Sequence, residues 1–351
     1  MKYSMMRYIE EYKNKSFHEY PFNPVDALLL SQLAYPKMEK IVPGFRADHY
    51  PTLKEIHEDP DYEALFTDPV YGQMYHEIFE EIYDSVRYGD IQASFFMKVS
   101  RRDQDCNFAA ITFRKGNHSF VAFRGTDGKI NAWKEDFNLA CEKVIPSQNL
   151  ALSYLKGAAR RTQGKLILSG HSKGGNIALY AASKAPLRIQ DRIQRIFSFD
   201  GVGFPRSFYG KKGFQRISDR IYKVIPREST VGLLFSDHCN PRIVKSYKHG
   251  LVQHDLMNWK IKDGRFQYCR SLKRSSKNLG NRLNRWIGSL TQTEIREYIN
   301  CLYQLIGGYE KTMVYELKPT EILSRIHDFI RHGDVEEKER FLRVSARLLT
   351  C

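Results

Sequence analysis

The spacing of apolar residues changes twice along this chain and divides it into three stretches. In the first, residues 1–90, apolar residues recur every three or four positions, as on one face of an α-helix. Asn23 to Asp26 has the composition of a helix cap, and a second amphipathic helix fits Tyr71 to Tyr88. We therefore expect an N-terminal helical segment over residues 1–90.

Beyond residue 90 the pattern predicts β-strands that alternate with helices. Two of the first three strands should form an antiparallel hairpin around a turn at Lys115 to Asn117. The alternation predicts an α/β core over residues 91–265, with a mostly parallel central sheet. The expected strands are Ala93 to Val99, Phe108 to Phe113, Ser119 to Phe123, Lys165 to Ser169, Arg195 to Phe199, Ile221 to Ile225 and Ile243 to Tyr247, and the expected helices are Trp133 to Cys141, Ser147 to Arg161 and Asn176 to Ala185.

After about Gly264 the strand signals stop and helical spacing returns. Thr291 to Glu294 has the form of a capping box, which marks the start of one helix. We predict a basic helical C-terminal extension over residues 266–351. Its expected helices are Leu279 to Leu290, Thr293 to Leu305, Pro319 to His332 and Val335 to Leu349.

Charge is distributed unevenly along the chain, whose formal net charge is +15. Residues 1–90 hold 9 Lys and Arg against 17 Asp and Glu, whereas residues 241–290 hold 12 against 2. Such a basic stretch is either a solvated face or a surface for an anionic membrane, an acidic partner or nucleic acid. No zinc-finger, RNA-binding or helix-turn-helix motif accompanies the charge, which disfavours nucleic-acid binding.

The sequence predicts neither a membrane span nor a secretory leader. Its apolar runs are far shorter than the roughly 18 residues that a transmembrane helix needs, and its first residues are charged and aromatic. The six cysteines are widely spaced and form no metal-binding pair. We therefore expect reduced thiols, a cytoplasmic protein, and no metal or organic cofactor.

One short segment carries the strongest indication of chemistry. Gly170, Ser172 and Gly174 form a G-x-S-x-G motif, with an expected strand before it and an expected helix after it. On such a sharp turn the serine hydroxyl projects from the sheet, and the helix N-terminus favours a developing oxyanion. We therefore expect Ser172 to be a nucleophile.

A serine nucleophile needs a base and an acid that orients the base. In the chain order typical of α/β-hydrolases, the acid and then a histidine follow the serine. His254, in a loop after the last expected strand, is the candidate base. Asp200, directly after the strand that ends at Phe199, is the preferred acid, while Glu228 and Asp237, after the next strand, stay open as alternatives.

The oxyanion hole should combine the backbone N–H of Lys173, the residue after the nucleophile, with a donor from an earlier loop. Phe123 to Thr126 is the expected loop, because a strand ends there and Gly125 permits a close approach of the backbone. The hydroxyl of Thr126 is a further candidate donor.

These segments resemble the class 3 lipase-like proteins of the α/β-hydrolase superfamily, which pair an FRGT/S loop with a GHSxGG elbow. The chain is more similar still to the bacterial Mbeg1-like family of hydrolase-like proteins, over about residues 20–265. The segments that carry this resemblance are Asn23 to Tyr35, Ala122 to Asp127, Trp133 to Asp136, Gly170 to Asn176, Ser198 to Phe204 and Gln253 to Asp255.

The resemblance implies an α/β-hydrolase fold in which Ser172 is the nucleophile, His254 the base and Thr126 an oxyanion residue. The chain departs from the lipase pattern at two places. No Asp-x-Val-Pro stands near Glu228, which leaves the acid open between the alternatives above. Lys173 replaces the apolar residue that many lipases carry, and this cation is expected to affect substrate preference.

Two functions of different classes follow from these observations. The favoured one is a serine hydrolase of lipase or esterase type, which cleaves an acyl ester or thioester of a small molecule or lipid through an acyl-enzyme. The alternative is a catalytically degenerate hydrolase fold that binds an anionic membrane or a protein partner. In both, Arg265 to Arg285 either packs its apolar residues on the core or lies on an anionic bilayer.

Overall fold

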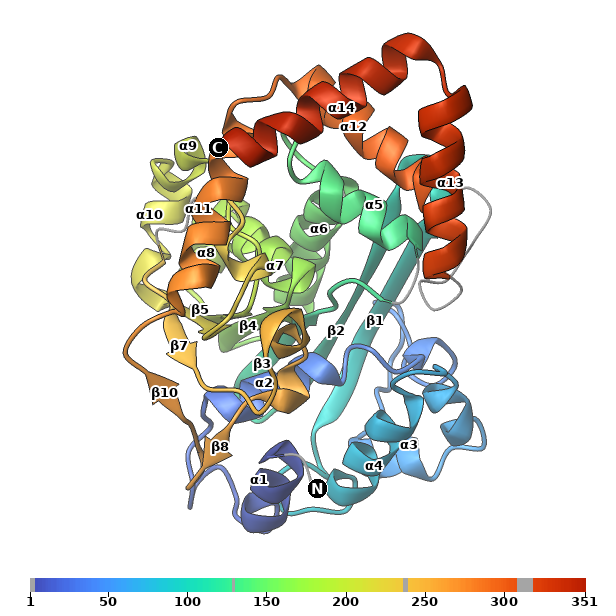
Figure 1. Cartoon of the computed structure of the whole chain (residues 1–351). Coiled ribbons are helices and arrows are strands. Elements are labelled where there is room, and N and C mark those ends of the chain that lie inside the picture. The colour runs from blue at the N-terminus through green and yellow to red at the C-terminus, as the bar shows by residue number, and fades with distance from the viewer. Residues whose placement is uncertain (1–3, 128–129, 236–238, 308–317) are drawn as a thin grey trace.

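An eight-stranded sheet runs through the middle of the molecule (Figure 1). The computed structural model describes residues 4–127, 130–235, 239–307 and 318–351. The strands of this sheet are β1 (Gln92–Arg101), β2 (Cys106–Lys115), β3 (His118–Phe123), β4 (Lys165–His171), β5 (Ile193–Phe199), β6 (Ile221–Pro226), β7 (Arg242–Val244) and β10 (Tyr268–Cys269), and they lie side by side in that order. Neighbours from β3 to β7 are parallel, so their carboxyl ends share one edge of the sheet.

The mostly parallel sheet confirms the predicted α/β architecture. β2 and β3 form the predicted hairpin, and β1 adds a third antiparallel strand. The expectation that strands end near Gly264 is wrong, because β9 (Arg265–Phe266) pairs with β8 (Ile261–Lys262) and β10 pairs with β7. Each of these strands has only two residues, too few for an alternation of apolar and polar side chains to show in the sequence.

Side chains of the central strands alternate between two cores. On β3, Phe120 and Ala122 belong to one core, whereas Val121 and Phe123 belong to the other. The N-terminal helices fill the first core, and the helices of the α/β region fill the second. The helices of the first core are α1 (Ser4–Tyr12), α2 (Pro24–Gln32), α3 (Leu53–His57) and α4 (Gly72–Ile82), and those of the second are α6 (Pro146–Arg161), α7 (Lys173–Lys184), α8 (Leu187–Gln190), α9 (Arg206–Tyr209) and α10 (Lys212–Gln215).

The C-terminal part contains the four predicted helices, which lie across the top and down both sides of the molecule in Figure 1. They are α11 (Arg274–Gly288), α12 (Gln292–Leu305), α13 (Pro319–His332) and α14 (Val335–Thr350). Ile295 and Ile299 of α12 pack against Cys141, which follows α5 (Ile130–Asn138). That residues 1–90, 91–265 and 266–351 form three separate parts stays a prediction.

No helix among the described residues is long and apolar enough to span a bilayer.

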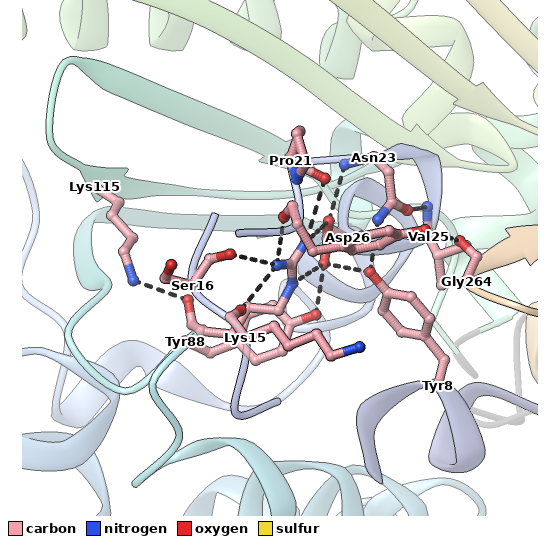
Figure 2. Close-up of polar contacts among 12 residues, drawn as sticks. Tyr8, Lys15, Ser16, Pro21, Asn23, Val25, Asp26, Tyr88, Lys115 and Gly264 are labelled. Carbon is pink, nitrogen blue, oxygen red and sulfur yellow. Dashed lines mark hydrogen bonds and ion pairs between the residues drawn. The ribbon is translucent and has the colours of Figure 1, made fainter. Parts of the chain in front are cut away.

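A fully buried ion pair joins α2 to the segment before β1. Nε and Nη2 of Arg87 donate to the two carboxylate oxygens of Asp26 at 2.8 and 2.6 Å, and both side chains are 0% exposed. The hydroxyls of Tyr8 and Tyr88 donate to the same carboxylate (Figure 2). The helix predicted from Tyr71 to Tyr88 ends at Ile82 instead, because the chain turns there and brings Arg87 inward.

Replacing Arg87 with leucine should lower the free energy of unfolding by about 3–5 kcal/mol, because the Asp26 carboxylate would stay buried without its counter-ion. Lys54→Leu is the matched control, since Lys54 pairs with Asp84 at 2.8 Å on the open surface, where water screens the charges. Urea denaturation of both variants measures the difference. Equal losses in the two variants would contradict a structural role for the buried pair.

Candidate active site

Ser172 lies on a sharp turn between β4 and α7, as the motif predicts. Its backbone φ of 56° and ψ of −127° are rare outside glycine, and holding them costs on the order of 1–3 kcal/mol. Two neighbours must be glycine: a Cβ on Gly170 would lie 2.3 Å from the backbone of Gly174, and one on Gly174 would lie 2.3 Å from the carbonyl oxygen of Phe123. The turn therefore fixes the serine between the end of β4 and the start of α7.

His254 and Asp200 meet at the carboxyl edge of the sheet. Nδ1 of His254 lies 2.7 Å from Oδ2 of Asp200, which directly follows β5 and is 1% exposed. The other carboxylate oxygen accepts hydrogen bonds from Ser229 Oγ at 2.6 Å and from the Gly232 N–H at 3.2 Å. Because a carboxylate only accepts, Nδ1 of His254 carries the proton and Nε2 is left as the basic nitrogen.

The alternative acid Glu228 is bonded elsewhere. Its carboxylate accepts from His249 Nδ1 at 3.1 Å, from Lys273 Nζ at 3.0 Å and from the Gly250 N–H at 3.2 Å. The bonds to His249 and Lys273 lower the pKa of Glu228 to about 2. The third candidate, Asp237, lies outside the described residues. The structure thus brings His254 together with Asp200 and not with Glu228.

The expected oxyanion loop lies against the serine turn. A Cβ on Gly125 would lie 2.4 Å from the carbonyl oxygen of His171, so only glycine allows this approach. Thr126 Oγ1 donates a hydrogen bond to Oδ2 of Asp136 on α5. Burial raises the pKa of Asp136 to about 6, although the Lys173 ammonium group and the Thr126 hydrogen bond both lower it. Above about pH 6 the carboxylate is therefore charged and holds the Thr126 hydroxyl.

Lys173, the first residue of α7, turns its side chain into the protein. Nζ lies 2.7 Å from Oε2 of Glu135, both side chains are 0% exposed, and Nζ also donates to the Asn107 carbonyl oxygen at 2.9 Å. Glu135 in turn accepts hydrogen bonds from the backbone N–H groups of Asn107 and Ser147, each at 3.0 Å. The expectation that this cation affects substrate preference loses its basis, because the ammonium group faces α5 inside the protein.

A second chain of hydrogen bonds joins the oxyanion loop to the candidate base. The Gly125 N–H donates to the Tyr35 hydroxyl at 3.2 Å, and Tyr35 lies 3.3 Å from His171 Nδ1. His171 Nε2 donates to the carbonyl oxygen of His254 at 2.9 Å, and the two rings lie 4.5 Å apart between centroids. Burial lowers the pKa of His171 well below its usual range, so its ring is neutral. Both ring nitrogens of His171 thus have partners, Tyr35 at Nδ1 and the His254 backbone at Nε2.

The sequence alone did not single out Tyr35, Glu135, Asp136 or His171 as site residues. All four lie within the segments that carry the family resemblance. One further signal could have identified Glu135. Lys173 follows the serine on a turn that is expected to be buried, and a buried lysine needs an acidic partner. Among the described residues, no group of three or more His, Cys, Asp or Glu side chains is placed to hold a metal ion.

The sheet order, the serine turn and the chain order of Ser172, Asp200 and His254 together define an α/β-hydrolase fold. The family model described as Mbeg1-like matches residues 82–304. A search of curated proteins finds no match.

Two crystal structures are similar to the chain. The crystal structure of M37 lipase is 11% identical and has a TM-score of 0.37, with 89% of this chain and 100% of that chain covered. A mutant form of MDLA from Penicillium cyclopium is 12% identical and has a TM-score of 0.34, with 51% of this chain and 70% of that chain covered.

Proposed function

The chain belongs to the Mbeg1-like family, and we propose that it is a serine hydrolase that cleaves an acyl ester. One observation carries this proposal. The imidazole of His254 is bonded through Nδ1 to the buried Asp200 and packs against His171, the residue before the strained Ser172. A base with a fixed tautomer close to a serine turn supports acyl transfer, in which the base takes the proton of the serine hydroxyl.

In this proposal Ser172 Oγ attacks the carbonyl carbon of the ester while His254 Nε2 takes the hydroxyl proton. The same nitrogen then gives that proton to the leaving alkoxide, or to a thiolate when the substrate is a thioester. Asp200 keeps Nδ1 protonated and stabilises the imidazolium ion. Water, activated by His254, cleaves the acyl-enzyme and releases the carboxylic acid and free Ser172.

The oxyanion would be bound by Thr126 and by the backbone N–H of Lys173. The Thr126 hydroxyl has only one proton, and Asp136 accepts it. The backbone N–H of Thr126 is therefore the donor that we assign to the oxyanion, and Asp136 orients the loop. Each such donor contributes a factor of about 10²–10³ to the rate in comparable enzymes.

A fluorophosphonate probe tests the proposal without knowledge of the substrate, because it reacts with an activated serine. The wild type should be labelled at Ser172, and Ser172→Ala should not be labelled. Asp200→Asn should slow labelling by several orders of magnitude, since loss of the triad acid costs about 10⁴-fold in turnover. Glu228→Gln is the matched control and should react at the wild-type rate. An unlabelled wild type would favour the catalytically degenerate fold, and a slow Glu228→Gln would move the acid to Glu228.

We infer in addition that the basic helix α11 brings this site to an anionic lipid surface. Asn284 Nδ2 donates to the carbonyl oxygen of Leu233 at 2.8 Å, so α11 packs on the loop whose Gly232 N–H holds Asp200. Leu251 and Val252, shortly before His254, are 68% and 57% exposed. Exposed apolar residues and cations next to a site suit a peripheral membrane contact. The exposed α11 cations are Arg274, Lys277, Arg282 and Arg285.

Co-sedimentation with vesicles checks this contact. The protein should bind vesicles of anionic lipid and not zwitterionic ones, because each basic residue near an anionic surface contributes about 1 kcal/mol. Changing the four exposed α11 cations to glutamine should abolish binding. A control variant with the same charge loss at other exposed positions, namely Lys143, Lys165, Arg188 and Arg195, should keep it. Equal binding to both lipids would contradict the membrane contact. In that case the apolar residues of α11 pack on the core and its cations face water.

A further inference from the structure

The N-terminal helices reach the candidate site through one hydroxyl group, that of Tyr35. This residue follows α2, which packs on the central strands β3, β4 and β5. The ring of Tyr35 stacks on Tyr75 of α4, with the ring centroids 5.9 Å apart and the planes inclined by 16°. Tyr75 is itself buried, at 6% exposure. Contacts of α2 and α4 thus determine where the hydroxyl group lies.

The direction of each hydrogen bond around this hydroxyl follows from the chemistry of the groups. A carbonyl oxygen only accepts, so Nε2 of His171, 2.9 Å from the His254 carbonyl oxygen, carries a proton. The His171 ring is neutral, because burial holds its pKa well below the usual range, and Nδ1 is therefore an acceptor. The Tyr35 hydroxyl, 3.3 Å from this Nδ1, donates to it. The Gly125 N–H donates to the Tyr35 oxygen at 3.2 Å.

One directed chain of hydrogen bonds therefore runs from Gly125 through Tyr35 to His171. Its last bond ends on the backbone of His254. The chain joins three parts that acyl transfer needs in a fixed arrangement, namely the expected oxyanion loop, the residue before the serine and the residue that supplies the base. The hydroxyl occupies the Gly125 N–H, which agrees with the assignment of the Thr126 N–H to the oxyanion.

We propose that Tyr35 is a positioning residue of the candidate site, which holds the oxyanion loop in place relative to the loop of His254. This inference rests on the proposed hydrolase function. In this role the hydroxyl group does not touch the reacting atoms and acts through Gly125 and His171. Without it, the Gly125 N–H and His171 Nδ1 lose their partner, and the loops shift to satisfy them. A shift of about 1 Å costs up to about 10²-fold in rate, so the chemical step should slow while substrate binding is kept.

Tyr35→Phe removes the hydroxyl group and keeps the ring. Labelling by a fluorophosphonate over a range of probe concentrations separates the maximal rate from the half-saturating concentration. In Tyr35→Phe the maximal rate should fall about 10–100-fold, because the oxyanion donor and the base lose their arrangement. The half-saturating concentration should stay within about twofold of the wild-type value.

Tyr50→Phe is the matched control. The Tyr50 hydroxyl donates to the carbonyl oxygen of Gly44 at 3.0 Å, and its ring belongs to the second core. This variant loses one tyrosine hydroxyl without touching the chain, so it should be labelled like the wild type. Thermal unfolding should show both variants folded at the assay temperature. Tyr35→Phe would overturn the proposal if it reacted at the control rate, or if only its half-saturating concentration changed.

Nitrogen NMR of the histidine rings tests the chain without any activity. The wild type should show His171 protonated on Nε2 and not on Nδ1. Tyr35→Phe should move the Nδ1 signal, because this nitrogen loses its donor, whereas Tyr50→Phe should leave the signal in place. A proton on Nδ1, or a signal that Tyr35→Phe does not move, would overturn the proposal. An unreactive wild type that shows these signals would overturn the hydrolase function, and with it the role of Tyr35, but not the hydrogen-bonded chain.

Discussion

The ammonium group of Lys173 lies 2.7 Å from the carboxylate of Glu135, and neither side chain is exposed to water. Removing one partner of such a pair costs about 3–5 kcal/mol, because the other charge stays buried alone. The pair joins the residue after the serine turn to α5. The backbone of Asn107 joins both to the start of β2, because its carbonyl oxygen accepts from Lys173 and its N–H donates to Glu135. The geometry of the candidate site therefore depends on where α5 lies.

The position of α5 also determines where the expected oxyanion loop, Phe123 to Thr126, lies. Asp136, next to Glu135 in the sequence, accepts a hydrogen bond from the hydroxyl of Thr126. The C-terminal helices hold α5 from the other side, through the packing of Ile295 and Ile299 on the segment that follows it. The C-terminal part thus supports the helix that carries Glu135 and Asp136. Movement of α12 would reach the oxyanion loop through α5.

Most strands, most helices and the serine turn could be predicted because their signals are local, whereas the two-residue strands β8, β9 and β10 could not. The G-x-S-x-G motif with its flanking elements identified Ser172 as the candidate nucleophile. The position of Asp200 directly after β5 identified it as a candidate acid. The acid could not be decided from the sequence, because the choice between Asp200 and Glu228 rests on how two loops fold over the sheet edge. The sequence suggested that the Lys173 cation acts at the site. Only the structure shows that this cation is buried in an ion pair with Glu135.

A double-mutant cycle on Lys173 and Glu135 tests most directly whether this pair holds the site together. Lys173→Met and Glu135→Gln should each lower the free energy of unfolding by about 3–5 kcal/mol and slow fluorophosphonate labelling. The double variant leaves neither member of this pair charged without its partner, so it should be more stable than either single variant. Losses in the double variant that equal the sum of the single losses would contradict the account, because the two side chains would then act independently.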